Sequence, residues 1–329
     1  MPGLTTTVAV TGAAGHLGAN LVPELLSAGY RVRCLVHRSL AGLDREAVET
    51  VPGDVLDPAS LRRAFTGCGV VFHLAGAVSI LGGRGGAVRR INVVGSRNVA
   101  RVCRESGARM IHCSSVQAFA PPPPGGVLTE SASLEDSPHA SPYARSKARA
   151  QGAVLGAAAR GLDAVVVAPT AVIGPRDHGP SRLGRLLIAL ADRRLPCLVE
   201  GAFDWVDARD VARGILTAAE RAPRGGLYLL GGHRLSLLEL ARHWCAAVGV
   251  NAPRIAAPLS PARAAALVGE LLAGLTDREP LLTREALDAL SGSAVVDCCR
   301  ARRELAYRPR PLEKTLADTA AWFRRRGML

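Results

Sequence analysis

The chain has 329 residues, of which 48% are apolar, so it is long enough to bury one large core or two unequal lobes. Its formal net charge of +13 is carried almost entirely by arginines spread along the sequence, and aromatic residues make up only 4%. This pattern argues against a nucleic-acid-binding surface and favours an anionic cofactor or substrate. We therefore expect a globular protein with no nucleic-acid partner.

The cysteines and the N-terminus indicate the compartment. None of the 8 cysteines forms a C-x-x-C pair, and no group of His, Cys and carboxylates has metal-ligand spacing. The first residues lack a charged region followed by an apolar one, and no apolar stretch is long enough to span a membrane. We expect a cytoplasmic chain with reduced cysteines, no bound metal and no membrane partner.

A glycine-rich turn follows the first predicted strand, Thr7 to Val10, and precedes a helix that is predicted to end near Ala28. Glycines allow a tight turn and a close approach of the backbone to a ligand, and the start of a helix favours a pyrophosphate. The turn is therefore predicted to bind a dinucleotide. The residues expected to do so are Gly12, Ala14, Gly15, His16, Leu17 and Gly18.

The second predicted strand, Arg31 to Val36, indicates which dinucleotide is bound. In an NAD site an acidic residue stands at the end of this strand and holds the ribose 2′-hydroxyl. Here His37 and Arg38 stand there instead, with Arg33 as a further basic candidate. A basic end suits a 2′-phosphate, so NADP(H) is favoured over NAD(H). The alternative is that these are surface charges and that backbone groups hold the ribose.

Further predicted strands at 47–51, 70–74, 109–113 and 164–167 alternate with helices, the longest of which is expected over 86–106. This alternation predicts an α/β fold with a Rossmann-type, doubly wound parallel sheet and a site at the carboxyl ends of its strands. At two of these ends, residues that allow a ligand to approach are candidates for cofactor binding: Asp54 and Val55, and Leu74, Ala75 and Gly76.

Beyond Pro169 the alternation fades, which divides the chain. We expect residues 1–170 to form an NADP-binding Rossmann domain and residues 171–329 a smaller, mainly helical substrate-binding lobe, with some segments returning to the first domain. Helices are expected at 181–194, from after 207 to 221, and at 236–248, 261–275, 283–290 and 312–325; strands are expected at 197–199 and 227–230.

The most informative stretch is Ser-Pro-Tyr-Ala-Arg-Ser-Lys at 141–147, on the first turns of a helix that is expected to reach Arg160. The chain has only 4 tyrosines and 2 lysines, so Tyr143 and Lys147 are an uncommon pairing. Four residues apart on a helix, the two side chains share one face, and the ammonium lowers the pKa of the phenol from about 10. The pair is a candidate for proton transfer near neutral pH, with a solvated helix surface as the alternative.

Taken together, these motifs resemble the extended short-chain dehydrogenase/reductase superfamily over nearly the whole chain, and most closely the dihydroflavonol-4-reductase and 3β-hydroxysteroid dehydrogenase branch. Those families bind NAD(P) and interconvert carbonyls and secondary alcohols. The motifs that carry the resemblance are Thr-Gly-x-x-Gly-x-x-Gly at 11–18, Gly-Asp-Val at 53–55, His-Leu-Ala-Gly at 73–76, Asn-Val-Val-Gly-Ser at 92–96, Cys-Ser-Ser-Val at 113–116, Tyr143-x-x-x-Lys147, and the stretch from Ala168 to Pro175.

The resemblance implies a role for each candidate. Tyr143 would protonate the developing alkoxide, Lys147 would hold the nicotinamide ribose and keep the phenol acidic, and Ser115 would hydrogen-bond the substrate oxygen, with Ser114 as the fallback. Asn92 would support the proton relay or the local backbone. Pro169 and Val172 would lie near the nicotinamide.

Substrate-facing residues are harder to predict, because each candidate could equally pack in the core. By position they are Val78, Ser79, Gln117, Phe119, Trp205, Val172 and Arg209. The expected partner is a small-molecule carbonyl compound. A homodimer through paired helices, which is usual in the superfamily, stays open.

Two functions compete. The first is an NADPH-dependent ketoreductase acting on a polyketide, phenolic or steroid-like ketone, with Tyr143 as the acid. The second is a nucleotide-sugar epimerase or dehydratase that uses tightly bound NAD(P). Sugar 4,6-dehydratases place Asp-Glu directly after the catalytic Ser or Thr, whereas Val116 and Gln117 follow Ser115 here. A redox-sensing scaffold without turnover would be expected to lack Tyr143 or Lys147, and both are present.

Overall fold

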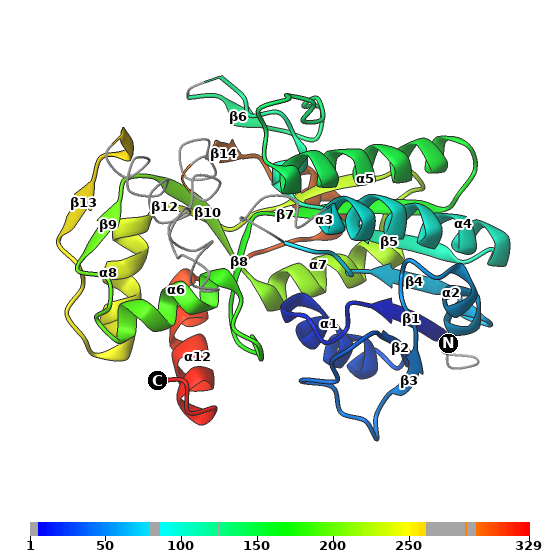
Figure 1. Cartoon of the computed structure of the whole chain (residues 1–329), viewed down its shortest axis with the longest axis horizontal. Helices are drawn as coiled ribbons and strands as arrows, with labels where there is room; N and C mark the ends of the chain where they lie inside the picture. The colour runs from blue at the N-terminus through cyan, green and yellow to red at the C-terminus, as the bar shows by residue number, and fades with distance from the viewer. Residues whose placement is uncertain (1–5, 79–85, 124, 261–286, 288–293) are drawn as a thin grey trace.

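The computed structural model describes residues 6–78, 86–123, 125–260, 287 and 294–329. Its centre is a seven-stranded sheet in the order β11-β7-β5-β4-β1-β2-β3, in which every neighbouring pair is parallel (Figure 1). The strands are β1 (Thr7–Thr11), β2 (Arg31–Val36), β3 (Glu49–Pro52), β4 (Val70–His73), β5 (Arg109–Cys113), β7 (Ala164–Pro169) and β11 (Leu227–Leu230). The predicted doubly wound parallel sheet is confirmed, and its strand order reverses at β1, beside β4.

Helices cover both faces of this sheet. One face packs against α1 (His16–Ser27), α7 (Ala208–Arg221) and α11 (Cys299–Leu305). The other packs against α2 (Pro58–Phe65), α4 (Ser96–Ser106) and α5 (Pro142–Ala159). The strands are rich in Val, Ile and Ala and are buried on both sides, so two apolar cores hold the three layers together.

The helix expected over 86–106 is interrupted. It consists of α3 (Ala87–Arg89), a π-helical segment η1 (Arg90–Gly95) and α4. π-Helical turns are rare and frequently occur at functional sites. Here the turn carries Asn92, whose buried side chain faces away from solvent.

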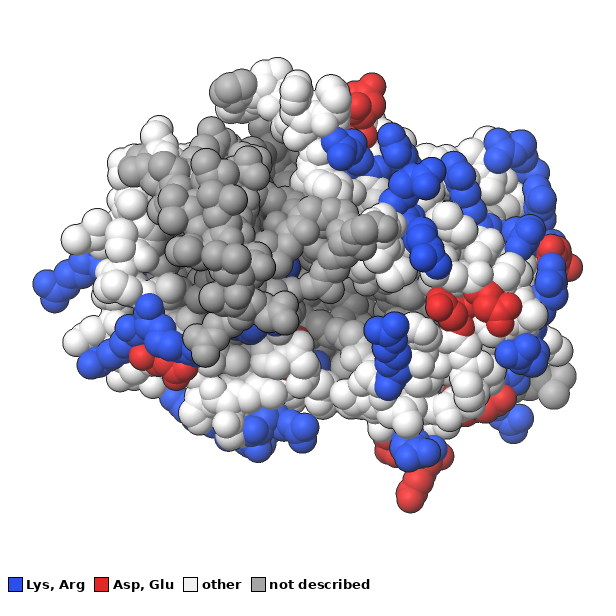
Figure 2. All heavy atoms as spheres, in the orientation of Figure 1, with Lys and Arg blue, Asp and Glu red and all other residues white. Residues whose placement is uncertain are grey.

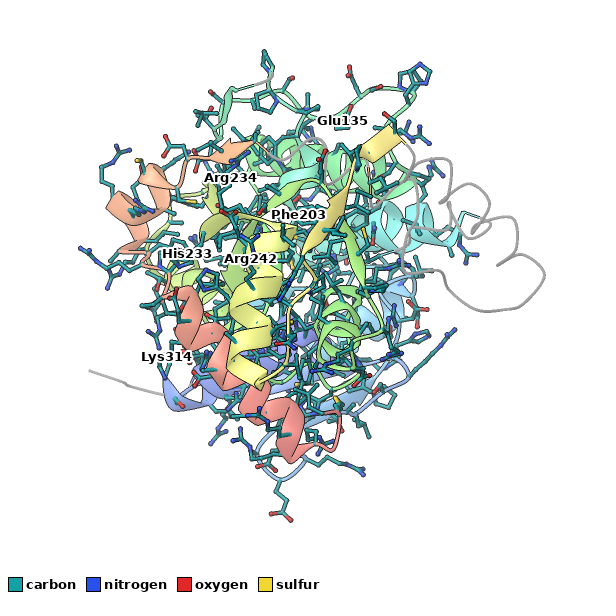
Figure 3. All side chains as sticks on the ribbon, turned by 90° about the vertical axis from the view of Figure 1, so that its left-hand side faces the viewer. Glu135, Phe203, His233, Arg234, Arg242 and Lys314 are labelled. Atoms are coloured by element: carbon teal, nitrogen blue, oxygen red, sulfur yellow. The ribbon has the colours of Figure 1, made fainter. Side chains whose placement is uncertain are left out.

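The C-terminal part contains helices and small sheets. Strands β8 (Ala171–Ile173), β10 (Ala202–Asp207) and β12 (His233–Ser236) form one sheet, while β9 (Cys197–Val199) pairs with β13 (Ile255–Ala257) and β6 (Val127–Leu128) with β14 (Val295–Val296). The helices are α6 (Arg182–Ala191), α8 (Leu237–Val248) and α12 (Leu312–Arg325). Figure 3 views α8 and α12 side by side, and their apolar faces meet in a core around Trp244 and Phe323.

Segments of the C-terminal half also pack on the Rossmann sheet. β11 pairs with β7, and α7 and α11 lie on the same face of the sheet as α1. The expected strand at 47–51 is found two residues later, as β3. The helices expected at 261–275 and 283–290 lie outside the described residues, apart from the buried Leu287.

Candidate functional site

The glycine-rich turn between β1 and α1 leaves no room for side chains. Gly12 has φ +73°, and a Cβ there would stand 2.6 Å from the backbone nitrogen of Ala75. A Cβ on Gly18 would collide with the carbonyl oxygen of Gly12. These two glycines therefore let β1, α1 and the end of β4 approach one another at backbone distance, as a bound dinucleotide requires.

The start of α1 suits a pyrophosphate. Gly15 is the N-cap residue, no side chain caps the helix, and the first turn carries no acidic residue, so the helix dipole is not already satisfied by a local carboxylate. His16 and Asn20 lie at 3.1 Å and 3.0 Å from the carbonyl oxygen of Pro175. The candidate cofactor turn is thereby tied to the loop that follows β8.

The basic residues at the end of β2 have different surroundings. Arg38 is exposed and has no acidic partner within the described part of the chain, whereas His37 lies 3.4 Å from the carboxylate of Asp54. Arg33, a further candidate for the 2′-phosphate, has structural contacts. Its guanidinium lies 2.8 Å from Glu49 and donates to the carbonyl of Thr66 at 2.7 Å, so it holds β3 and the end of α2.

Lys147 is buried behind the carboxyl end of β5. Its Nζ donates a hydrogen bond of 2.9 Å to the carbonyl oxygen of Cys113, the last residue of that strand. A Cβ on Gly76 would stand 3.6 Å from the same nitrogen, so the end of β4 lies next to the ammonium. Burial lowers the pKa of Lys147 from its ordinary value. Tyr143, one helical turn earlier on α5, is partly exposed.

Asn92 joins η1 to α5 and to the end of β4. Its amide donates to Ser146 Oγ at 2.8 Å and to the carbonyl of Ala77 at 2.9 Å, and its Oδ1 accepts from the backbone N–H of Ala77 at 2.7 Å. Ser146 Oγ then donates to the carbonyl oxygen of Tyr143 at 2.7 Å. Since each polar atom of the amide is occupied, Asn92 is suited to fix the backbone around Tyr143 and Lys147.

A buried chain of hydrogen bonds connects the glycine-rich turn to Asn92, and His73 is at its centre. Ala75 N–H donates to Thr11 Oγ1, which lies 2.8 Å from His73 Nδ1. His73 Nε2 lies 2.9 Å from Ser96 Oγ, which donates to the carbonyl of Asn92. Every donor meets an acceptor only if His73 is neutral with its proton on Nε2. Burial and the charge of Lys147 lower the pKa of His73 to about 3, which agrees with a neutral ring at neutral pH.

This chain was not predicted from the sequence. His73 is part of the His-Leu-Ala-Gly motif but had no role assigned to it, and Thr11 and Ser96 lie at the edges of two other motifs. The pattern that could have identified them is a polar residue at the inward-facing end of an otherwise apolar strand, because such a residue must find a partner.

Next to His73 the buried polar groups are less well satisfied. His112 is the register partner of His73 on β5, and the two rings stack with centroids 5.4 Å apart. Both ring nitrogens of His112 lack a hydrogen-bond partner in the described structure, as do Ser114 Oγ and the side-chain amide of Gln151. Burial, followed by the charges of His73 and Lys147, lowers the pKa of His112 well below its ordinary value.

Ser115 is accessible, and Ser114 is not. Ser115 is the N-cap of a short 3-10 turn, η2 (Val116–Ala118), and its Oγ accepts the backbone N–H of Gln117 at 3.2 Å. That bond leaves the hydroxyl proton of Ser115 available to a ligand. Ser114 is 97% buried, so Ser115 is the better candidate to contact a substrate oxygen.

The expected substrate-facing residues do not form one group. Val78 is 57% exposed at the end of the segment after β4, and Gln117 and Val172 are half-buried. Trp205 and Phe119 are buried in apolar cores, and the indole N–H of Trp205 donates to the carbonyl of Leu235 at 3.1 Å. Ser79 lies outside the described residues.

Two other candidates also have structural contacts. Arg209 is paired with Asp207 at 2.6 Å and with Asp318 at 2.7 Å, which ties α7 to α12. Pro169 ends β7 and is buried. Core packing therefore explains the positions of Trp205 and Phe119, and ion pairs explain that of Arg209, without a contact to substrate.

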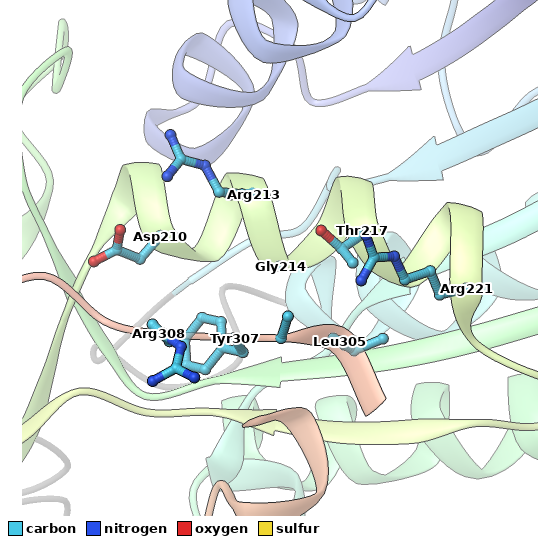
Figure 4. Close-up of a pocket in the computed structure, with 9 residues that line it drawn as sticks. Asp210, Arg213, Gly214, Thr217, Arg221, Leu305, Tyr307 and Arg308 are labelled. Carbon is cyan, nitrogen blue, oxygen red and sulfur yellow. The ribbon is translucent and has the colours of Figure 1, made fainter. Parts of the chain in front are cut away.

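The structure also contains a cavity away from these residues. It has a volume of about 310 Å³ and lies between α7 and the segment from Leu305 to Arg308 (Figure 4). Asp210, in its wall, is already bonded to Arg310 at 2.8 Å. None of the residues predicted to bind cofactor or substrate lines this cavity, and α7 is on the opposite face of the sheet from α5.

No group of three or more His, Cys, Asp or Glu side chains in the described part of the chain could hold a metal ion. Among the described helices, none is long and apolar enough to cross a bilayer.

Comparisons with known proteins agree with this geometry. Residues 8–231 match the family described as the NAD dependent epimerase/dehydratase family. The chain is 36% identical to sterol demethylase protein B of Methylococcus capsulatus over 98% of this chain and 100% of that protein. It is 32% identical to a putative dihydroflavonol 4-reductase of Synechocystis over 97% and 94% of the two chains. The solved structure of gox2253 superposes with a TM-score of 0.87 at 32% identity, covering 99% of this chain and 100% of the other.

The glycine turn, the parallel sheet and these similarities lead to one conclusion. The chain is an NAD(P)-dependent oxidoreductase of the extended short-chain dehydrogenase/reductase superfamily, and it belongs to the NAD dependent epimerase/dehydratase family.

Proposed function

We propose that the protein is an NADPH-dependent ketoreductase that transfers hydride between the nicotinamide and an apolar ketone, with Tyr143 as the acid. The observation that carries this proposal is the Lys147 ammonium, held by the Cys113 carbonyl at the carboxyl end of β5 and one helical turn from Tyr143. A fixed positive charge beside a phenol favours the phenolate, so the phenol gives up its proton more readily.

The chain's own residues would act in a defined order on a bound ketone. Ser115 donates its free hydroxyl proton in a hydrogen bond to the carbonyl oxygen and orients it. NADPH, when bound, would supply the hydride that the carbonyl carbon accepts. Tyr143 transfers its phenolic proton to the same oxygen, and Lys147 stabilises the resulting phenolate until solvent returns the proton. The product is a secondary alcohol, and the reverse sequence oxidises it.

The residues that would hold the cofactor come from the carboxyl ends of β1, β2, β3, β4 and β7 and from β8. The glycine turn and the first turn of α1 would take the pyrophosphate, and Arg38 would pair with the 2′-phosphate. Asp54 and Val55 would border the adenine. Leu74, Ala75, Gly76, Pro169 and Val172 would border the nicotinamide half.

A sterol-like ketone is the best-supported member of the substrate class. The relative of 36% identity is named for sterol demethylation, and the one of 32% identity for reduction of a dihydroflavonol, a phenolic ketone. Both chains align over nearly their full lengths, so the similarity includes the C-terminal half that would contact the substrate. Polyketide ketones of similar size belong to the same class.

The nucleotide-sugar alternative has less support. Val116 and Gln117 stand where sugar 4,6-dehydratases have Asp-Glu, and the acidic ribose ligand that is usual in epimerases is replaced by Arg38. The family description includes epimerases, so the two activities need to be separated by experiment.

The test is a panel of sterol, phenolic and polyketide-like ketones with NADPH, assayed by loss of NADPH absorbance, for the wild type and Tyr143→Phe. We expect turnover of at least one ketone and a loss of roughly 10²-fold or more in the variant, with unchanged NADPH affinity. Near-normal activity of Tyr143→Phe would refute the role of the phenol.

A further inference from the structure

The outer surface of α3, η1, α4 and α5 carries an unusual concentration of arginines. Residues 86–106 and 142–160 contain one acidic residue, Glu105, against eight arginines that are exposed or half-buried. They are Arg89, Arg90, Arg97, Arg101, Arg104, Arg145, Arg149 and Arg160. Figure 2 shows Lys and Arg gathered over this part of the molecule, and we call these eight residues the arginine face.

The fold brings the arginine face together from two separate segments. Arg97, Arg101 and Arg104 are spaced three and four residues apart on α4, so they share one side of that helix. Arg145 and Arg149 are likewise four apart on α5, which packs beside α4 and η1. A charge that looks evenly spread in the sequence is therefore concentrated in space.

The positive charge of this face is largely uncompensated. Glu105 is bonded to Arg62 of α2 at 2.9 Å and lies 3.9 Å from Arg101, so its carboxylate is shared between two guanidinium groups. Within the described structure, Arg89, Arg97 and Arg149 have no acidic partner. A surface of this kind attracts an anionic partner over about a Debye length, roughly 8 Å at physiological salt.

Apolar and small residues lie among these arginines. Val94 lies on η1 between Arg90 and Arg97 and is 37% exposed. On α5 the turns between Arg149 and Arg160 include the partly exposed Ala153 and Gly156, which have little or no side chain. A face with many guanidinium groups and an exposed valine among them matches a phospholipid surface, where charge and shallow apolar contact act together.

We propose that the arginine face binds the surface of an anionic phospholipid bilayer, without any segment crossing it. Two copies of the face would oppose each other with like charges, which disfavours a homodimer through α4 and α5. Apart from Tyr143 the two segments carry no aromatic residue on which a base could stack, which disfavours single-stranded nucleic acid. This proposal departs from the expectation of no membrane partner.

Membrane binding would also affect how a substrate reaches the candidate site. Tyr143 is on the same helix as Arg149, so docking would bring the candidate site close to the lipid surface. A sterol-like ketone dissolved in the bilayer would then reach the enzyme without crossing water. This last step rests on the proposed function, whereas the binding itself does not.

The experiment is flotation of the full-length protein with vesicles of phosphatidylcholine alone or with about 30% phosphatidylglycerol, without substrate. We expect binding to the anionic vesicles only, with release by about 0.5 M NaCl. The variant Arg89→Gln, Arg90→Gln, Arg97→Gln and Arg149→Gln should bind at least ~10-fold more weakly. The matched control, Arg221→Gln, Arg302→Gln, Arg308→Gln and Arg325→Gln, makes the same charge change on exposed residues of α7, α11, the following segment and α12, and should bind like the wild type.

Three outcomes would overturn the proposal. One is the absence of binding to anionic vesicles. Another is an equal loss of vesicle binding in both variants, which would mean that binding depends only on the net charge of the protein. The third is a dimer, or a complex with RNA or DNA tighter than that with vesicles, that the first variant abolishes and the control retains. Ketone reduction measured in detergent on the same samples reports separately on the proposed function.

Discussion

Lys147 Nζ donates to the carbonyl oxygen of Cys113 at 2.9 Å, so the only buried ammonium in the described chain is fixed to the end of the central strand β5. The bond orients the charge without neutralising it, because its acceptor is a carbonyl rather than a carboxylate. A charge held in this way remains available to the phenol of Tyr143 and to a bound ribose.

Lys147→Met should abolish activity and leave the fold intact. The substitution keeps much of the side-chain volume and removes a buried charge, so we expect a change in unfolding free energy within about 1–2 kcal/mol and a loss of turnover of roughly 10²-fold or more. Lys314→Met, an exposed lysine on α12, is the control. Turnover above a tenth of wild type in Lys147→Met would contradict the role of the ammonium.

Arg38 should determine the choice of cofactor. Arg38→Ala removes a guanidinium that would pair with the 2′-phosphate, so we expect the dissociation constant for NADPH to rise by roughly 10-fold and that for NADH to change little. Fluorescence titration of both cofactors measures this, with Arg33→Ala as a variant that should lose stability instead. Tighter binding of NADH than of NADPH by the wild type would overturn the assignment.

Gly12 and Gly67 form a matched pair of left-handed glycines, with φ +73° and +72°. A Cβ on Gly67 meets nothing within 4 Å, whereas one on Gly12 meets the backbone of Ala75 at 2.6 Å. Gly67→Ala should therefore show only the conformational penalty, about 1 kcal/mol, and bind cofactor normally. Gly12→Ala should lose cofactor affinity as well, and equal behaviour of the two variants in titration would contradict the assigned turn.

The stacked histidines should behave differently on substitution. His73→Leu removes hydrogen bonds to Thr11 and Ser96 and should cost about 2–3 kcal/mol of unfolding free energy. His112→Leu removes no hydrogen bond recorded in the described structure and should stay within about 1 kcal/mol of wild type. Urea unfolding at neutral pH distinguishes them, and a larger loss in His112→Leu would contradict the network.

The same histidines predict how stability depends on pH. The pKa of His73 is lowered to about 3 in the folded protein, whereas the unfolded chain takes up a proton near 6.5. The stability contributed by the neutral ring is therefore present above pH 6.5 and is lost as pH falls toward 3, with a slope of at most about 1.4 kcal/mol per pH unit for each histidine. His73→Leu and His112→Leu should each flatten this slope.

The elements that are specified by a local sequence pattern could be predicted from the sequence. The glycine turn, the parallel strands and α12 are specified by β-branched runs, glycines and helical periodicity, and α12 begins and ends at the predicted residues 312 and 325. The π-helical turn at Asn92 does not follow, because its cause is tertiary, namely the bonds of Asn92 to Ala77 and Ser146.

Two of the candidates have ion-pair partners that lie elsewhere in the sequence. Arg33 pairs with Glu49 and Arg209 with Asp318, and no local pattern reveals such partners. The strands β8, β10 and β12 were missed for a related reason, since they have only three to six residues each and pair across long sequence separations. The arginine face likewise exists only once α4 and α5 lie side by side.

The central claim is net hydride transfer to a ketone, and isotope transfer tests it most directly. The wild type would be incubated with a sterol-like ketone and NADPH deuterated at the transferred C4 position, with mass spectrometry of the product. We predict one deuterium on the carbinol carbon and one NADP⁺ formed per alcohol. Conversion of a nucleotide sugar without net NADPH oxidation, together with no deuterium in any ketone of the panel, would contradict the account.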